Sequence, residues 1–236
     1  MTTPALATQP LRTVFVTGGS SGLGAAIVAA VTKVGAVAAV IDLAPPQDPS
    51  IPHVLADLSD SAAAADAVER LVGLVGPPDA VVTAAGTDVC GPLSGVSAED
   101  WERVVRVNLF GTAAVCRAAL PHLEPRRGRI VTVASTLGFR AVGDATAYCA
   151  SKFAVVGFTR ALATGMAGRV AVTLLVPGGM RTHFFDGRSE QYRPGPDAAL
   201  NDPEDVAATV LVTLQQPWGC EIRELVVAAS QEPSWP

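Results

Sequence analysis

The chain is poor in the residue types that build metal centres and disulfide frameworks. Among its 236 residues there are four cysteines and three histidines. None of the cysteines forms a C-x-x-C pair, so we expect no zinc site and no other metal. Scattered thiols of this kind favour reduced cysteines in a cytoplasmic protein. The cysteines are Cys90, Cys116, Cys149 and Cys220, and the histidines, which do not cluster, are His53, His122 and His183.

Charge and long apolar runs are also scarce. Charged residues make up 17% of the chain, aromatic residues 5%, and the formal net charge is −5. An acidic balance argues against nucleic acid or an anionic membrane as a partner. No apolar run approaches the length of a membrane-spanning helix. The start, residues 1–10, contains proline and has no basic region, which predicts a flexible tail rather than a secretory signal.

What the chain does have is a regular alternation of strand and helix patterns. Hydrophobic residues make up 49% of it, as expected of a parallel sheet covered on both faces. The alternation predicts an α/β fold, a Rossmann-type doubly wound parallel sheet of about seven strands, in a single domain over residues 11–236. Strands are expected near Thr13–Thr17, Val37–Asp42, His53–Ala56, Ala80–Thr83, Arg129–Ala134, Val170–Val176 and Glu224–Val227, and helices from Gly22, Ser59, Ala98, Asn108, Ala145 and Pro203.

A glycine-rich turn follows the first expected strand. The sequence Thr17-Gly-Gly-Ser-Ser-Gly-Leu-Gly24 separates that strand from an alanine-rich helix. Glycines allow backbone to approach a pyrophosphate closely, and the start of a helix offers free N–H groups and a positive dipole end. The turn therefore predicts a dinucleotide phosphate site, with a simple tight turn as the alternative.

An acidic residue ends the second expected strand. Asp42 lies about 20 positions beyond the glycine turn, where a carboxylate can accept hydrogen bonds from the adenosine ribose hydroxyls. It would repel a 2′-phosphate, and neither the turn nor residues 43–46 contain Arg or Lys. The sequence therefore favours NAD over NADP, unless the carboxylate merely ends a strand in solvent.

A tyrosine and a lysine stand four residues apart at Tyr148 and Lys152. On a helix this spacing places both side chains on one face. A nearby ammonium stabilises phenolate and lowers the pKa of the tyrosine, which makes it usable as a general acid or base. Alone, the pair could equally be two stacked surface side chains.

Together these segments resemble the short-chain dehydrogenase/reductase family over about residues 12–227. Ser135 lies 13 positions before Tyr148, where the family has its catalytic serine, and Pro177-Gly-Gly-Met-Arg-Thr182 resembles its turn beside the nicotinamide. The resemblance implies the catalytic residues Ser135, Tyr148, Lys152 and Asn108. It also implies the cofactor-binding residues Gly18, Ser20, Ser21, Gly22, Leu23, Gly24, Asp42, Asp57, Leu58, Ala84, Ala85, Gly86, Tyr148, Lys152, Pro177, Gly178, Met180 and Thr182.

Four positions depart from the family pattern. Thr83 replaces an asparagine after the fourth strand, although its hydroxyl can still form a hydrogen bond. Ala134 replaces the first of two serines, and Thr173 replaces an asparagine before the Pro-Gly turn. The C-terminus, residues 230–236, lacks the usual Asp-Gly-Gly. This last departure leaves open how the substrate pocket is closed.

The predicted function is NAD(H)-dependent interconversion of a secondary alcohol and a ketone. Tyr148 acts as general acid/base, and, by resemblance, Lys152 binds the nicotinamide ribose while Asn108 holds a water that links Lys152 to solvent. Reduction of a 3-oxoacyl thioester is the enzymatic alternative, and an NAD-sensing regulator is the non-enzymatic one. The loop of residues 178–201 is expected to be a substrate lid. By resemblance, the chain forms a homotetramer or homodimer through residues 113–120 and 154–163.

Overall fold

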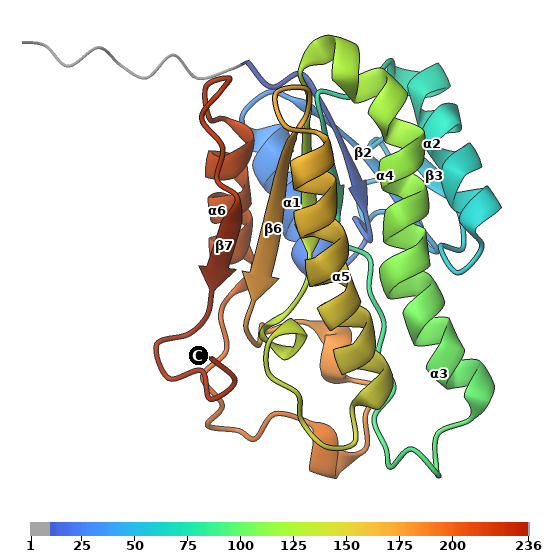
Figure 1. The fold of residues 1–236 in the computed structure, drawn as a ribbon, viewed down its shortest axis with the longest axis vertical. Coiled ribbons are helices and arrows are strands. Elements are labelled where there is room, and N and C mark those ends of the chain that lie inside the picture. Colours follow the sequence, from blue (N-terminus) through green and yellow to red (C-terminus); the bar gives the residue numbers. More distant parts are fainter. Residues whose placement is uncertain (1–9, 236) are drawn as a thin grey trace, which may run out of the picture.

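The computed structural model describes residues 10–235, so the tail expected over residues 1–10 lies almost entirely outside the described part. Seven parallel strands form one sheet (Figure 1). Their spatial order is β3 (His53–Leu55), β2 (Val37–Asp42), β1 (Thr13–Thr17), β4 (Ala80–Thr83), β5 (Arg129–Val133), β6 (Ala171–Pro177) and β7 (Glu224–Val227). The Rossmann-type parallel sheet expected from the sequence is therefore confirmed.

Helices cover both faces of this sheet. On one face lie α1 (Gly22–Lys33) and α6 (Pro203–Leu214); on the other lie α2 (Ser61–Val75), α4 (Thr112–Leu123) and α5 (Thr146–Gly165). Because successive strand residues point to opposite faces, Val14 and Val16 pack on the α1 side while Phe15 packs on the α2 side. The central strands therefore contribute to two apolar cores, which explains the unbroken burial of β1, β4, β5 and β6.

Two helix starts differ from the expected positions by more than one residue. Helix α2 begins at Ser61, because the Asp60 carboxylate accepts from the backbone N–H groups of Ala62 and Ala63 and caps the helix. The helices expected separately from Ala98 and Asn108 form one continuous run. In it, α3 (Ala98–Val105) passes through a π-helical turn, η1 (Arg106–Gly111), into α4.

This continuous helix corrects the expectation about apolar runs. The run Ala98–Arg126 spans 29 residues with a window of mean hydropathy 1.2, so it meets the length and composition of a membrane-spanning helix. Half of that window is buried inside the domain, and α4 packs against the sheet and α2. A core helix of a folded domain has the same properties.

The order of the strands reverses between β1 and β4, and this defines where a ligand can bind. The chain leaves β1 toward β2 on one side and later returns to β4 on the other. In such sheets ligands bind beyond the carboxyl ends of the strands at this switch point. In Figure 1 those ends point down toward the loops that follow β4, β5 and β6 and toward the C-terminal segment.

Candidate active site

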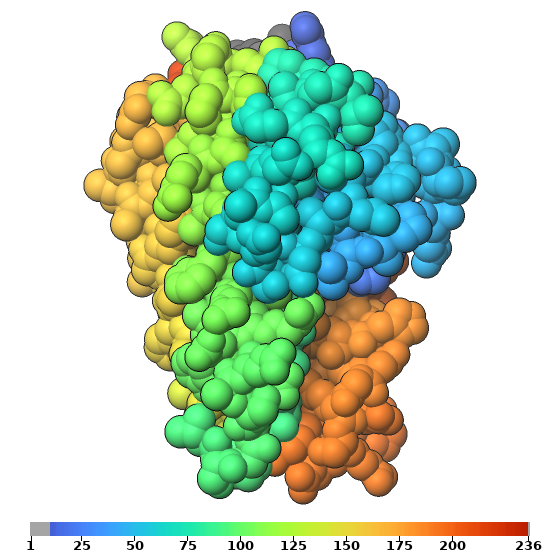
Figure 2. All heavy atoms as spheres, turned by 90° about the vertical axis from the view of Figure 1, so that its right-hand side faces the viewer, coloured from blue at the N-terminus to red at the C-terminus, as the bar shows by residue number. Residues whose placement is uncertain are grey.

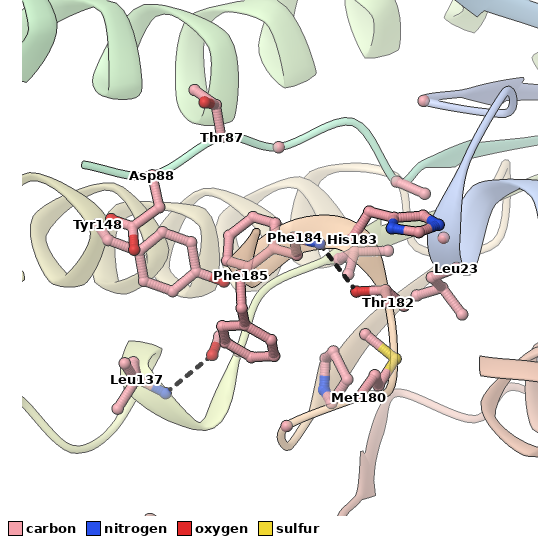
Figure 3. A pocket seen from close by; sticks show the side chains of 18 of the residues that line it. Leu23, Thr87, Asp88, Leu137, Tyr148, Met180, Thr182, His183, Phe184 and Phe185 are labelled. Carbon is pink, nitrogen blue, oxygen red and sulfur yellow. Dashed lines mark hydrogen bonds between the residues drawn. The ribbon is translucent and has the colours of Figure 1, made fainter. Parts of the chain in front are cut away.

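One large cavity lies at the carboxyl ends of the strands, with a volume of about 990 Å³. Nearly all of the residues predicted to bind cofactor or substrate line it (Figure 3). The lining residues among them are Gly18, Ser21, Gly22, Leu23, Gly24, Asp42, Asp57, Leu58, Ala84, Ala85, Gly86, Ser135, Tyr148, Lys152, Pro177, Gly178, Met180 and Thr182. Ser20 and Asn108 lie outside this wall. The sequence motifs, which are spread over 165 positions, therefore converge on a single site.

The glycine turn is packed too closely for side chains. Gly18 has a φ of +68°, and a Cβ there would lie 2.7 Å from Cα of Ala85. A Cβ on Gly24 would lie 2.0 Å from the carbonyl oxygen of Gly18. These contacts bring the start of α1 against the end of β1, with the turn's backbone facing the cavity. Such a cradle suits a phosphate group at a helix N-terminus.

Asp42 is held next to the glycine turn by backbone donors. Its Oδ2 accepts from the backbone N–H of Ser20 at 3.0 Å, and its Oδ1 accepts from that of Leu43 at 2.6 Å. The Ser20 hydroxyl donates to the carbonyl of Ala44. Ser20 thus orients Asp42, and it is not among the residues that line the cavity.

The catalytic candidates come from two neighbouring elements. Ser135 follows β5, and Tyr148 and Lys152 lie one turn apart on α5; all three are buried. The ammonium of Lys152 donates to the carbonyl of Val133 at 2.9 Å and lies 5.5 Å from the centroid of the Tyr148 ring. The predicted helical spacing therefore places both groups at the same end of the cavity.

Burial dominates the protonation of this pair. Loss of hydration raises the pKa of Tyr148 to about 12, although interaction with the Ser135 hydroxyl lowers it. Loss of hydration also lowers the pKa of Lys152 to about 8. The expectation that the lysine brings the pKa of the tyrosine below its usual value is therefore wrong for this arrangement, because desolvation disfavours both charged forms.

The buried lysine makes a testable contribution to stability. Between its folded pKa of about 8 and its unfolded value of 10.5, the unfolded chain binds more protons at Lys152, so this group's contribution to stability rises with pH. Lys152→Met removes the contribution. We expect the Tm of Lys152→Met minus the Tm of the wild type to fall as pH increases from 7 to 10, because the wild type gains stability over this range. Calorimetry of both proteins measures it, and a pH-independent difference contradicts the lowered pKa.

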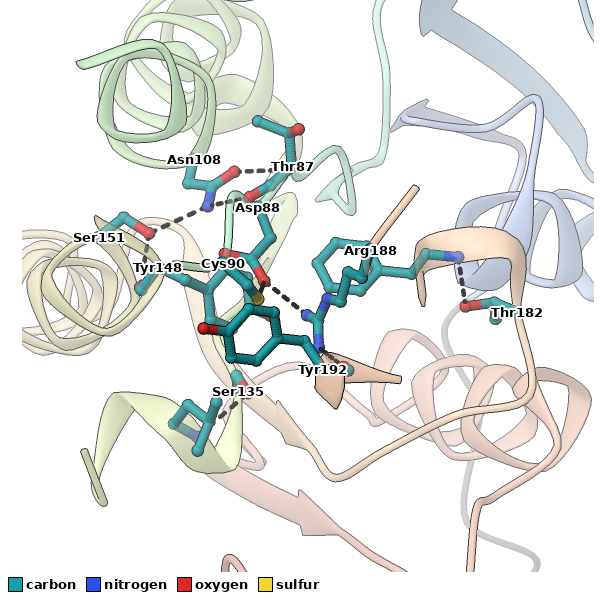
Figure 4. A network of polar contacts seen from close by, with 12 residues as sticks. Thr87, Asp88, Cys90, Asn108, Ser135, Tyr148, Ser151, Thr182, Arg188 and Tyr192 are labelled. Atoms are coloured by element: carbon teal, nitrogen blue, oxygen red, sulfur yellow. Dashed lines mark hydrogen bonds and ion pairs between the residues drawn. The ribbon is translucent and has the colours of Figure 1, made fainter. Parts of the chain in front are cut away.

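Asn108 lies behind the cavity in the π-helical turn. Its Oδ1 accepts from the backbone N–H of Thr87 at 2.8 Å, while its Nδ2 donates to the carbonyl of Thr87 and to the hydroxyl of Ser151 (Figure 4). Ser151 in turn donates to the carbonyl of Tyr148. The amide therefore joins the loop after β4 to the catalytic helix. Its side chain is used for positioning, and π-helical turns often mark such functional places.

Thr83 does not form the hydrogen bond expected of it. Its Oγ1 is buried and has no hydrogen-bond partner within the described part of the chain. The backbone N–H of Ala85 is instead satisfied by the hydroxyl of Thr17 at 3.1 Å. The end of β4 still holds, because Thr83 pairs with Thr17 and Thr132 in the sheet register.

An ion pair that the sequence analysis missed lines the cavity together with Tyr148. Asp88, two residues beyond Gly86, accepts from Arg188 of the 178–201 loop at 2.5 Å, and its side chain is 4% exposed. Phe184 of the same loop packs on Tyr148, with ring centroids 5.7 Å apart. In Figure 2 this loop, in orange, lies beside the green segment that contains residues 88–110. In the sequence, the position of Asp88 shortly after the end of β4 could have indicated that it belongs to the site.

The C-terminal segment forms another unforeseen wall. Residues 231–234 line the cavity. The Glu232 carboxylate accepts from the backbone N–H of Gly179 at 2.9 Å, and the Ser234 hydroxyl donates to that of Thr136. Trp235 packs edge-on against Phe139, with ring centroids 5.5 Å apart. The C-terminal segment therefore closes part of the cavity wall beside Gly179 and Thr136.

His183 lines the cavity, whereas Cys149 does not. His183 lines its rim, yet its side chain is 90% exposed and contacts Asp186. Cys149 is buried in a cluster with Ala145 and Leu137 and does not itself line the cavity, as expected from its place beside Tyr148. No cluster of three or more His, Cys, Asp or Glu side chains suited to a metal occurs within residues 10–235.

Comparison with known proteins now identifies the family. A model of the short chain dehydrogenase family matches residues 12–193. The chain therefore belongs to the short chain dehydrogenase family. The family uses nicotinamide cofactors, in agreement with the glycine turn and the cavity described above.

The curated relatives are distant and differ in length. The chain is 28% identical over 240 residues to the glycine betaine reductase ATRR of Emericella nidulans, covering 94% of this chain and 19% of that protein. It is 32% identical over 151 residues to an uncharacterised oxidoreductase of Staphylococcus aureus, covering 63% of each chain. The chain thus spans about a fifth of the first relative and less than two thirds of the second.

Solved structures share the fold. An alcohol dehydrogenase from Thermococcus sibiricus, complexed with 5-hydroxy-NADP, has a TM-score of 0.83 at 21% identity, covering 94% of this chain and 97% of that one. A dehydrogenase/reductase from Sinorhizobium meliloti has a TM-score of 0.81 at 26% identity, covering 94% and 96%. The first of these likenesses concerns the fold alone.

Proposed function

We propose that the protein is an NAD(H)-dependent oxidoreductase that interconverts a secondary alcohol and a ketone. The observation that carries the proposal is the convergence of Ser135, Tyr148 and Lys152 in a buried cavity whose other end is the glycine turn. A proton carrier, a hydroxyl donor and a dinucleotide cradle in one cavity are what hydride transfer to a carbonyl carbon requires.

The residues present fit a nicotinamide dinucleotide. The glycine turn leaves no room for side chains where a pyrophosphate would approach. Asp42 at the end of β2 would hold the adenosine ribose. Thr182 lines the cavity beside Gly22 of the turn, and Lys152 lines it beside Tyr148. Two cations of the wall are already paired, Arg103 with Asp57 at 3.5 Å and Arg188 with Asp88. This supports NAD over NADP, because a 2′-phosphate would meet the Asp42 carboxylate.

The chain's own groups handle the substrate oxygen and its proton. The cofactor, when bound, supplies or accepts the hydride. Tyr148 donates the proton of its phenol to the ketone oxygen, or takes it from the alcohol. The Ser135 hydroxyl hydrogen-bonds the same oxygen where charge develops. A pKa of about 12 keeps Tyr148 protonated near neutral pH, which equips it as the acid of ketone reduction.

The cofactor preference is tested at Asp42. We expect titration calorimetry to give a lower Kd for NADH than for NADPH. Asp42→Asn keeps an acceptor for the N–H of Ser20 and removes the charge that repels a 2′-phosphate, so the preference should fall about tenfold. The control is Asp66→Asn on the exposed face of α2. A wild type that prefers NADPH refutes the role of Asp42, and binding of neither cofactor refutes the proposal.

Reduction of a 3-oxoacyl thioester remains the second enzymatic candidate, and the structure adds little to its support. An anionic carrier would need free cations at the lid. The three lid arginines are already engaged: Arg181 with Asp202, Arg188 with Asp88, and Arg193 with the carbonyls of Arg188 and Asp186. Steady-state assays with an acetoacetyl thioester and either cofactor would reveal this activity.

An NAD-sensing regulator would need the cofactor cradle alone. The buried Ser135, Tyr148 and Lys152 have no part in such a role.

We also propose that copies of the chain associate through the exposed face of the α4 and α5 layer, where Phe110 and Phe153 are about half exposed. Half of residues 113–120 are buried within the chain and only Arg117 among them is exposed, so that stretch offers less surface than expected. Light scattering that shows a monomer would contradict the association.

A further inference from the structure

The ion pair between Asp88 and Arg188 has hydrogen-bonding capacity that the protein leaves unused. Oδ2 of Asp88 accepts from both Arg188 and the thiol of Cys90, whereas Oδ1 is buried without a partner. On the other side, Nε of Arg188 is also buried without a partner. Within residues 10–235 only four buried side-chain atoms lack one, and two of them belong to this pair.

Both side chains face the catalytic end of the cavity. Asp88 and Arg188 line it together with Tyr148 and Phe184. The side chain of Asp88 extends toward Tyr148 (Figure 3), and its charge affects the pKa of both Tyr148 and Lys152. The pair therefore lies at the same end of the cavity as the proposed site of the reacting oxygen.

The pair is also held by further contacts of Arg188. The guanidinium of Arg188 lies 4.6 Å from the ring centroid of Phe185 and 5.3 Å from that of Phe184. It also donates to the backbone carbonyl of Tyr192 (Figure 4). Contacts on several sides fix the direction of the free Asp88 oxygen and the free Arg188 N–H. A preorganised donor and acceptor of this kind recognise a matching group at little entropic cost.

We propose that Asp88 and Arg188 form a polar subsite that selects substrates with a second hydroxyl group beside the reacting carbon, such as diols, hydroxy ketones and sugar-like polyols. A hydroxyl is both donor and acceptor, so it can serve either free atom. This inference rests on the proposed dehydrogenase function, and it names the substrate class for that site.

Charge selects a hydroxyl over the other groups that could bind here. An ammonium group would enter a cavity that already contains Arg188 and Lys152, and a carboxylate would meet the buried charge of Asp88. The Asp88–Arg188 ion pair is neutral overall. A neutral hydroxyl therefore binds beside it without adding an unpaired charge to this buried site. An alcohol without the second hydroxyl leaves the free oxygen of Asp88 unsatisfied, and sites built to bond a hydroxyl reject such analogues strongly.

The test compares matched alcohols that differ by one hydroxyl, with NAD as oxidant. The pairs are 2,3-butanediol with 2-butanol and trans-1,2-cyclohexanediol with cyclohexanol. We expect kcat/KM to be at least about tenfold higher for the diol of each pair. Asp88→Asn should bring this ratio close to one, because it removes the charged acceptor. Asp186→Asn, an exposed lid carboxylate outside the cavity wall, should keep the ratio.

Two further measurements keep the result decisive. If Asp88→Asn fails to fold because Arg188 is left unpaired, the double variant Asp88→Asn/Arg188→Gln removes both charges and should also lose the ratio. Calorimetric binding of each alcohol to the protein saturated with NADH separates recognition from turnover. Tighter binding of the diols without any oxidation would refute the dehydrogenase function and retain the subsite. Equal or undetectable binding of both alcohols, or an unchanged ratio in the Asp88 variants, would overturn the subsite.

Discussion

Tyr148→Phe is expected to reduce kcat by roughly 10²–10⁴-fold, the usual contribution of a general acid or base. The change removes only the phenolic oxygen that carries the proton. The ring keeps its place beside Phe184, 5.7 Å between centroids, and a buried hydroxyl is replaced by hydrogen. The fold and the cofactor cradle should therefore be unaffected, and the Kd of NADH should change by no more than about twofold.

The chain provides a matched control for this variant. Tyr192 is its second tyrosine, and it lies in the lid with its hydroxyl donating to Asp144 at 2.8 Å, outside the cavity wall. Tyr192→Phe makes the same chemical change without touching the reacting oxygen, so its kcat should stay close to that of the wild type. Stopped-flow and steady-state rates on one substrate decide the matter. Near-native turnover in Tyr148→Phe would refute the assignment of Tyr148.

The sheet and the cofactor end of the site were predictable because they depend on local sequence. Each strand is a short run of apolar, β-branched residues, and each glycine of the turn is needed where backbone crowds backbone, as at Gly18. Asp42 ends its strand in the expected position. These features follow from the periodicity of strands and the geometry of a strand–turn–helix unit, so the order of residues alone reveals them.

The substrate end was less predictable because it depends on contacts between distant segments. Asp88 and Arg188 are 100 positions apart, and nothing in either neighbourhood indicates their pairing. The same holds for Glu232 and Gly179, 53 positions apart. The prediction of a lowered pKa for Tyr148 failed for a related reason. Helical spacing shows that Lys152 is near, but the direction of the pKa shift is decided by the depth of burial, which depends on the whole fold.

The glycine turn gives the second large expected effect. Gly24→Ala should raise the Kd of NADH by roughly 10²-fold, the loss that a displacement of about 1 Å in a binding geometry can cause. A Cβ at this position would lie 2.0 Å from the carbonyl oxygen and 2.6 Å from the carbonyl carbon of Gly18. These are backbone atoms, so no side-chain rotation relieves the overlap. Gly18 cannot retreat toward β4 either, because it already lies against Ala85.

Gly73→Ala is the control for a glycine that has no close neighbour. Gly73 lies inside α2, and no atom lies within 4 Å of the position its Cβ would take. Alanine has the higher helix propensity, so the free energy of unfolding should rise by about 0.5–1 kcal/mol while the Kd of NADH stays unchanged. Titration calorimetry and thermal unfolding of both variants make the comparison. Native cofactor affinity in Gly24→Ala would show that the turn is not the phosphate cradle, whatever the result at Gly73.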